Sequence, residues 1–348
     1  MWKSNVLVVG IFCALASGSA LAVEGVKIQK LLTGLTNPSG VAIRPGDTAD
    51  RYEVFIADSG AGRVLRAWSN QPNESTEAIS AFSITTFGGE PMKAGPIALL
   101  FLDRERLVVG VSGNNRSANL RLYHLAEKAI LAEQHIQQVD VAREGAPAEE
   151  TANHVYAIAR TRSNDRVPDA FVLTATRNDQ TARLHKVAVR ADQFGKLETF
   201  AANENNFAGE FPVAAAVTQQ GYVVAGHVGA LDRPHDSRIV FYSPIDGTRV
   251  MDLSTNLYDI VALAYSPHTG NLYAADIAWM APNESGIYRI DDAADRGKAA
   301  CVAVKVASIA GPSAMAFGPD GALYVTAFGE PNAANPKTGS ILKLTGEL

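Results

Sequence analysis

Short apolar stretches separated by tight turns run along almost the whole chain. The clearest lie near the C-terminus, where residues 311–317 and 322–325 flank a turn that carries Asp320 and Gly321. Residues 340–344 follow after a polar loop and have alternating faces. Apolar runs bounded by Gly, Pro and Asp are typical of strands joined by turns. The pattern therefore predicts three consecutive antiparallel strands.

The same order of three strands recurs about every 50 residues, a spacing typical of repeat architectures. Copies at 37–68, 260–290 and 311–344 are sharp, and three weaker copies fill the middle. The aligned positions of the first strand in each copy are Ala42, Leu100, Ala157, Ala216, Ala264 and Ala316. Small residues suit strands that converge on a crowded axis. Six such copies predict an all-β, six-bladed β-propeller with four-stranded antiparallel blades.

A fourth strand follows the third in the first five copies, at residues 79–85, 136–141, 197–201, 249–253 and 302–309. The sixth copy leaves no room for one, but residues 26–32 near the N-terminus have the same pattern. We therefore expect this segment to pair as the outer strand of the last blade. Such a closure would remove the edge that an open ring exposes.

The first 22 residues have the pattern of a secretory signal peptide. Lys3 precedes an apolar run at 6–16, and small residues lead to Ala20, Leu21 and Ala22. We expect cleavage after Ala22, a destination in the periplasm or outside the cell, and a single propeller domain at 23–348. A membrane anchor is the alternative, but spanning a bilayer needs about 20 continuous apolar residues. Cys13 lies in the expected signal, which leaves Cys301 without a disulfide partner.

The charge of the chain narrows the classes of partner. Its formal net charge is −5, and we find no run of Lys and Arg. Nucleic acids and anionic membranes need a basic patch for tight binding. We therefore expect no nucleic-acid partner. Because no later segment is apolar enough to cross a bilayer, we also expect no membrane span after signal cleavage. We expect a monomer.

Residues 34–42, followed by 55–64, resemble an NHL-type repeat, and residues 311–325 resemble the same repeat in exported bacterial propellers. The broader resemblance is to six-bladed propellers that include the gluconolactonase-like and strictosidine-synthase-like groups. The resemblance implies the fold of the whole mature chain. Gluconolactonase-like enzymes hold a divalent metal with Glu, Asn and Asp, and their first blade opens with Glu-Gly-Pro. Here residues 37–40 read Asn-Pro-Ser-Gly, so the leading metal ligand is missing and no catalytic residue is transferred.

Candidate site residues follow from topology. In an antiparallel blade, the start of the inner strand and the end of the second strand lie at the same face. Four titratable residues of the third to fifth copies occupy such positions, and we predict that they bind a ligand at the channel mouth: His154, Glu210, His227 and Asp259. Because His, Glu and Asp suit zinc or calcium, the metal alternative is held by His154, Glu210 and Asp259. The structural alternative is that these side chains bond backbone groups between blades.

Other polar residues at this face have a simpler interpretation. Asp58 and Asp276 occupy equivalent repeat positions, and repetition favours a structural role as acceptors of hydrogen bonds from the loop that follows. His235 lies in a long loop that could reach over the mouth. Trp279 and Met280 form an apolar loop tip that either packs on a neighbouring loop or contacts a ligand.

Two classes of function remain open. The first is an exported scaffold that binds a small molecule, a glycan or a protein through the channel mouth and the long loops. The second is a metal-dependent, lactonase-like hydrolase or lyase that acts on a small molecule or sugar, with calcium or zinc in the central channel. The sequence establishes no cofactor and no catalytic residue, because it carries no nucleophile motif and no phosphate-binding loop. Metal analysis of the purified protein would separate the two classes.

Overall fold

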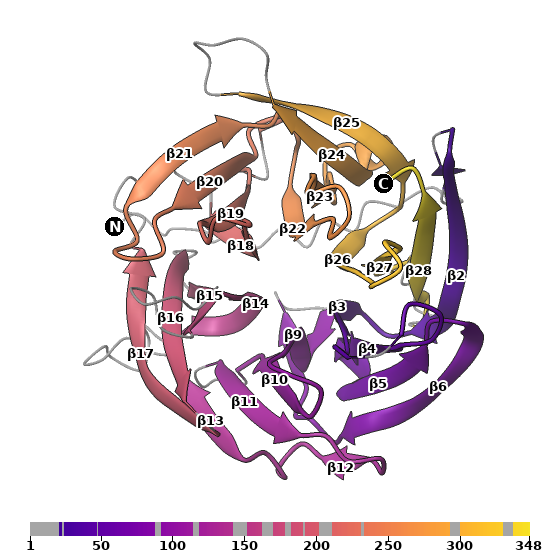
Figure 1. The fold of residues 1–348 in the computed structure, drawn as a ribbon, viewed down its shortest axis with the longest axis vertical. Helices are drawn as coiled ribbons and strands as arrows, with labels where there is room; N and C mark the ends of the chain where they lie inside the picture. Colours follow the sequence, from indigo (N-terminus) through magenta and orange to yellow (C-terminus); the bar gives the residue numbers. More distant parts are fainter. Residues whose placement is uncertain are drawn as a thin grey trace, which may run out of the picture.

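The computed structural model describes residues 21–22, 24–46, 48–87, 92–113, 118–141, 152–161, 170–177, 182–190, 192–201, 211–230, 233–292, 300–329 and 337–348. Six sheets surround a central axis, and the first strand of each lies closest to that axis (Figure 1). Among these residues, no helix has the length and apolar character needed to cross a bilayer. The prediction of a six-bladed β-propeller is confirmed.

Each blade contains an inner, a second, a third and an outer strand. Blade 1 consists of β3 (Pro38–Ile43), β4 (Glu53–Asp58), β5 (Arg63–Trp68) and β6 (Gln71–Ser80), and blade 2 of β9 (Pro96–Phe101), β10 (Arg106–Val111), β11 (Asn119–His124) and β13 (Gln137–Asp140). Blade 3 consists of β14 (Ala152–Arg160), β15 (Ala170–Arg177), β16 (Ala182–Arg190) and β17 (Gln193–Ala201), and blade 4 of β18 (Phe211–Val217), β19 (Val223–Val228), β20 (Arg238–Tyr242) and β21 (Arg249–Ser254). Blade 5 consists of β22 (Ile260–Tyr265), β23 (Leu272–Asp276), β24 (Gly286–Asp292) and β25 (Cys301–Ser308).

Blade 6 joins the two ends of the chain. Its first three strands are β26 (Pro312–Phe317), β27 (Leu323–Ala327) and β28 (Gly339–Gly346), and its outer strand is β2 (Val26–Leu35). The antiparallel pairing of β2 with β28 runs from Val26 opposite Gly346 to Leu35 opposite Gly339. In Figure 1, the indigo β2 lies along the yellow β28. The predicted closure of the ring is confirmed, and the closing strand extends three residues beyond Leu32.

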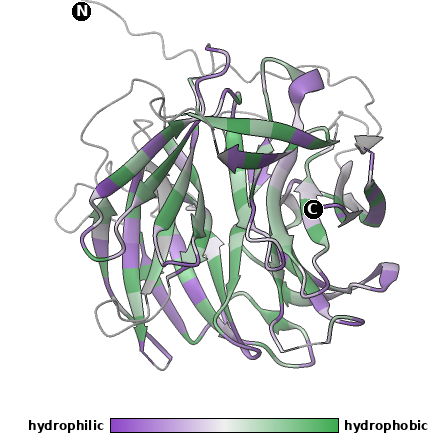
Figure 2. Ribbon diagram, turned by 45° about the horizontal axis from the view of Figure 1, so that its top comes forward, coloured by the Kyte–Doolittle hydropathy of each residue, from purple (hydrophilic) through white to green (hydrophobic). Residues whose placement is uncertain are grey.

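Hydrophobic packing between the blades holds the ring together. The buried apolar side chains form six clusters, each shared by two neighbouring blades. The rings of Phe55 and Phe101 meet edge to face at 4.9 Å between blades 1 and 2, and those of Tyr273 and Phe317 meet at 5.3 Å between blades 5 and 6. Hydrophobic positions accordingly recur along the strands (Figure 2). Because each seam is packed on both sides, the ring forms a rigid support for the loops at its two faces.

The structure differs from the sequence expectation in its outer strands and in one register. The outer strand of blade 1 was expected at 79–85 but lies at Gln71–Ser80, directly after a tight turn from β5. Two short strands also extend blades: β12 (Ile130–Leu131) pairs in parallel with β6, and β1 (Leu21–Ala22) pairs with β25. In blade 3, a bulge places Ala159, rather than Ala157, at the register position of Ala42.

Candidate functional site at the channel mouth

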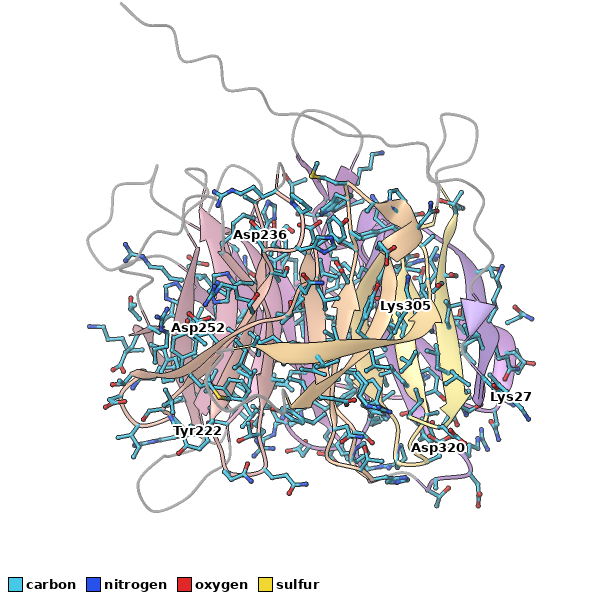
Figure 3. All side chains as sticks on the ribbon, turned by 90° about the horizontal axis from the view of Figure 1, so that it is seen from above. Lys27, Tyr222, Asp236, Asp252, Lys305 and Asp320 are labelled. Carbon is cyan, nitrogen blue, oxygen red and sulfur yellow. The ribbon has the colours of Figure 1, made fainter. Side chains whose placement is uncertain are left out.

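The two ends of the channel differ in their loops. Antiparallel pairing sets Pro38 opposite Asp58 and Ile260 opposite Asp276, so inner-strand starts and second-strand ends share one face. The loops between second and third strands extend from this face, which we call the mouth. Figure 3 shows Asp236, from one of these loops, at the upper face, and Tyr222 and Asp320, from turns between inner and second strands, at the lower face.

Register shifts identify equivalent residues at the start of each inner strand. Every inner strand has a bulge close to where its pairing begins; β14 has two, and its second, between Val155 and Ala157, corresponds to the single bulge of the other five. The residue before the first residue that flanks this bulge can therefore be matched between blades. The matched residues, from blade 1 to blade 6, are Asn37, Gly95, His154, Phe211, Asp259 and Gly311. The three polar residues therefore come from alternate blades, and glycine or phenylalanine stands between them. We call Asn37, His154 and Asp259 the mouth ring.

Asn37 connects blade 1 to the strand that precedes blade 2. Its backbone has a φ of +48°, in the left-handed region that asparagine tolerates better than most residues. Its Nδ2 donates to the carbonyl of Lys93, which lies 3.3 Å away. Among the described residues, the Asn37 carbonyl oxygen is left as an acceptor.

His154 is almost fully buried at the start of its strand. Its Nδ1 lies 3.1 Å from the hydroxyl oxygen of Ser112, which follows the second strand of blade 2. The ring of Tyr156 is 5.7 Å from the imidazole. Burial lowers the pKa of His154 to about 3, because desolvation disfavours the charged imidazolium. The side chain is therefore neutral at physiological pH, with one ring nitrogen a donor and the other an acceptor.

Asp259 provides the carboxyl group of the mouth ring, and its protonation is strongly perturbed. It is 3% exposed, its Oδ2 accepts the Trp279 backbone N–H at 3.1 Å, and its own N–H donates to Asp276 Oδ1 at 2.7 Å. Burial raises the pKa of Asp259 to about 7; the charges of Asp276 and Asp236 add to the rise, and the Trp279 N–H opposes it. The group can therefore accept or release a proton near neutral pH.

His227 occupies a different position from the mouth ring. It pairs with Pro212 at the end of β19, where blades 1 and 5 have Asp58 and Asp276. It is 4% exposed, and its Nε2 has no hydrogen-bond partner among the described residues. Burial lowers the pKa of His227 to about 4, and the charged groups that act on it belong to the two outer strands of blade 4. The imidazole therefore lies inside the blade, although the neighbouring Val228 forms a backbone bridge with Asp259.

The repeated aspartates accept structural hydrogen bonds, as expected, but mostly from the segment before the inner strand rather than from the loop that follows. Asp58 accepts the Thr36 N–H at 2.6 Å and the Arg63 Nε–H at 2.9 Å. Asp276 accepts three backbone N–H groups, from Tyr258, Asp259 and Ala278. Three of these donors precede an inner strand, Ala278 belongs to the loop after β23, and Arg63 begins β5. Each carboxylate therefore ties the start of an inner strand to a segment that follows the second strand. Burial raises the pKa of both carboxyl groups, and the hydrogen bonds from their donors make this rise smaller.

Two predictions from the sequence are not tested by the described residues: the position of Glu210 and the metal site that includes it. Glu210 lies outside the described residues. Among the described residues, no three His, Cys, Asp or Glu side chains are grouped so that they could hold a metal ion. The metal set of His154, Glu210 and Asp259 therefore stays a prediction.

Asp236 was not singled out from the sequence. Its Oδ2 accepts the Ala230 N–H at 3.0 Å, and its buried Oδ1 has no partner within the described part of the chain. A Cβ on Gly229 would lie 1.7 Å from this Oδ1, so only glycine leaves room for the carboxylate. Gly229 is the sequence feature that could have pointed to Asp236, but its role becomes clear only in the fold, where the loop places Asp236 against it.

Comparison with known proteins gives matches to the fold alone. The PQQ-bound aldose sugar dehydrogenase of Streptomyces coelicolor matches with a TM-score of 0.59 at 12% identity, over 93% of this chain and 100% of that one. A gluconolactonase from Xanthomonas campestris gives 0.57 at 12%, over 95% and 98%. The calcium-binding protein regucalcin of Agrobacterium tumefaciens gives 0.52 at 14%, over 90% and 92%. No family profile and no curated protein matches the sequence. The chain is therefore similar in fold to these propellers.

Proposed function

We propose that the protein binds a small polar molecule at the channel mouth, held by the mouth ring and flanked by the loops of blades 4 and 5. The observation that carries this proposal is the arrangement of Asn37, His154 and Asp259 at one register position in alternate blades. Three polar groups spaced around one axis can contact a single ligand from different sides. Propellers commonly bind ligands at such a mouth.

The chemistry of the ring favours a ligand with several hydroxyl groups. Asn37 offers a carbonyl oxygen, His154 is neutral, and Asp259 changes its protonation near neutral pH. Such groups both donate to and accept from hydroxyls without requiring a charged ligand. Two of the similar propellers have names that refer to sugar chemistry, an aldose dehydrogenase and a gluconolactonase. We therefore propose a sugar or sugar lactone as the ligand.

Calorimetric titration of the full chain with monosaccharides and aldonolactones tests the proposal. We expect Asn37→Ala, His154→Ala and Asp259→Asn each to weaken binding about tenfold or more, the cost of about one ligand hydrogen bond. Tyr222→Ala is the control, because Tyr222 is 39% exposed and lies at the lower face. Equal affinities in the wild type and all three ring variants would contradict a site at the mouth.

Metal-dependent hydrolysis is the second candidate, because His154 and Asp259 are residue types that bind zinc or calcium and share one register position at the mouth. The described residues do not supply three metal donors, so a bound ion would also require Glu210. A stoichiometric calcium or zinc ion that is lost in the His154→Ala, Asp259→Ala double variant would support this candidate. Protein that stays metal-free in the presence of both ions would remove it.

We propose that the protein is exported, on the basis of the signal pattern in residues 1–22. N-terminal sequencing of protein recovered from the host should then begin at Val23. Recovery of the chain with Met1 intact would contradict the proposal.

A further inference from the structure

The structure holds His235, an exposed loop residue, in an unusual backbone conformation. Its φ is +60°, in the left-handed region that non-glycine residues seldom adopt. Asn256, which contacts the His235 ring through its carbonyl, has a φ of +59°. An exposed side chain in a loop would normally be free to choose an easier conformation, so the surrounding contacts must impose this one.

Two contacts fix the imidazole ring. Its Nδ1 lies 2.9 Å from the carbonyl oxygen of Asn256. Because a carbonyl can only accept, Nδ1 carries the proton, and Nε2 is the acceptor of the neutral ring. The ring also packs on Tyr258, with 4.3 Å between the two centroids. The orientation and the tautomer of His235 are therefore both set before any ligand arrives.

The position of His235 is next to the mouth ring. Tyr258 directly precedes Asp259, whose carboxylate accepts the N–H of Trp279 from the loop of blade 5. Trp279 follows Ala278, which is also left-handed with a φ of +46°, and Met280 is 50% exposed. Strained, rigid backbone of this kind tends to cluster at functional sites. Here Asn256 lies three residues before Asp259, and Ala278 precedes Trp279, whose N–H binds the Asp259 carboxylate.

We propose that His235 is a ligand-contact residue, whose Nε2 accepts a hydrogen bond from a hydroxyl of a cyclic sugar or sugar lactone bound against Asp259. The inference rests on the proposed function and adds to it a specific residue and a ring-shaped ligand. The apolar face of such a ring fits the aromatic and thioether side chains of Tyr258, Trp279 and Met280, and its hydroxyls fit Nε2 and the Asp259 carboxyl.

The test separates ligand contact from a structural role. His235→Gly removes the ring and relieves the left-handed backbone, because glycine adopts positive φ readily. His235→Asn keeps a residue type that tolerates this conformation and removes the imidazole. His268→Asn is the matched control, since His268 is an exposed histidine in the turn between the inner and second strands of blade 5, at the lower face. The probes are glucose, glucono-1,5-lactone and myo-inositol, titrated calorimetrically into the full chain, with the melting temperature of each variant measured in parallel.

We expect both His235 variants to bind about tenfold more weakly, the equivalent of one lost hydrogen bond. His268→Asn should bind like the wild type, and His235→Gly should melt at the wild-type temperature or above it. Normal binding by both His235 variants, with Asp259→Asn still impaired, overturns the inference and leaves the proposed function standing. A clear fall in the melting temperature of both His235 variants also overturns it, because the residue would then be structural. If the wild type binds none of the probes, both proposals fail.

Discussion

Buried polar groups are hydrogen-bonded to one another at one seam of the ring, whereas at another seam some of them lack partners among the described residues. At the lower side of the seam between blades 6 and 1, Tyr52 donates to Asp320 at 2.5 Å and shares a hydrogen bond with Tyr324 at 2.9 Å. Lys343 completes the cluster at 3.1 Å from Asp320, and both tyrosines are fully buried. At the mouth side of the seam between blades 4 and 5, Asp236 has a buried oxygen without a partner, and Asp259 accepts only one backbone bond in the described part of the chain.

The difference separates a joint that closes the ring from a surface that is prepared for a ligand. Satisfied buried networks stabilise a fold, whereas buried polar groups without partners cost stability. The first seam joins the two ends of the chain, so its network adds to the closure by β2. The seam between blades 4 and 5 does not join the ends of the chain, yet it contains strained backbone and a buried acid with incomplete hydrogen bonding in the described part of the chain. Strained backbone and buried polar groups without partners are features that functional sites are expected to show.

The largest effect should follow removal of the closing strand. A chain that starts at Thr36 lacks β2 and with it Leu31, Leu32 and Leu35, each at most 4% exposed. Burying each leucine contributes about 1.5–3 kcal/mol, and their sum approaches the 5–15 kcal/mol of a typical domain. We expect this chain to lack a cooperative melting transition, whereas a chain that starts at Val23 should melt like the full protein. Similar melting of the two chains would show that the ring closes without β2.

Acid should weaken the mouth side of blade 4 through His227. The unfolded imidazole binds a proton below about pH 6.5, whereas the folded one stays neutral down to a pKa of about 4. The free energy of unfolding should therefore fall as the pH decreases through this window, by on the order of 3 kcal/mol from this group. Denaturant melts from pH 7 to pH 4 should show a shallower fall for His227→Gln. Parallel pH profiles would mean that His227 gains a proton without cost.

A smaller effect distinguishes two tyrosines at equivalent positions of neighbouring blades. Tyr324 and Tyr273 pair with Ala316 and Ala264, and both are fully buried. The Tyr324 hydroxyl belongs to the lower network, whereas the Tyr273 hydroxyl has no partner of hydrogen-bonding geometry among the described residues. Tyr324→Phe should cost about 1–2 kcal/mol in denaturant unfolding, and Tyr273→Phe close to nothing. Equal losses would remove the network from the account of ring closure.

The smallest effect should come from backbone strain. Ala278→Gly should leave the stability unchanged or raise it by up to about 1 kcal/mol, because Ala278 is left-handed. Ala274→Gly in the neighbouring strand β23 should instead cost about 1 kcal/mol, since glycine weakens a strand. Denaturant unfolding of the pair measures the difference. A loss at position 278 as large as that at 274 would argue against stored strain in this loop.

The parts of the fold that repeat could be predicted from the sequence. Inner strands rich in small residues, glycine-containing turns and apolar second strands recur, and the segment at 26–32 matches the outer strands. The outer strand of blade 1 could not be placed, because residues 71–77 are polar and mostly exposed and give no apolar signal. The parallel strand β12 has only two residues, so no sequence pattern predicts it either.

The candidate site was predictable in place but not in detail. Topology correctly puts His154 and Asp259 at inner-strand starts, and their equivalence to Asn37 emerges only from the bulges. His227 shows the limit most clearly: the sequence correctly places it at the end of a second strand, level with Asp58 and Asp276, but does not show that its imidazole is buried there. The contacts that orient His235 depend on Asn256 and Tyr258, which lie about 20 residues away in another segment.

Hydrogen–deuterium exchange with and without the sugar or lactone that binds best tests the central claim most directly. The account predicts that the ligand protects peptides covering 233–237, 256–260 and 277–285 at the mouth, and leaves the already slow peptides around Tyr52 and Tyr324 unchanged. Protection confined to the lower turns near Asp320, or no protection at the mouth by a ligand that binds, would contradict it.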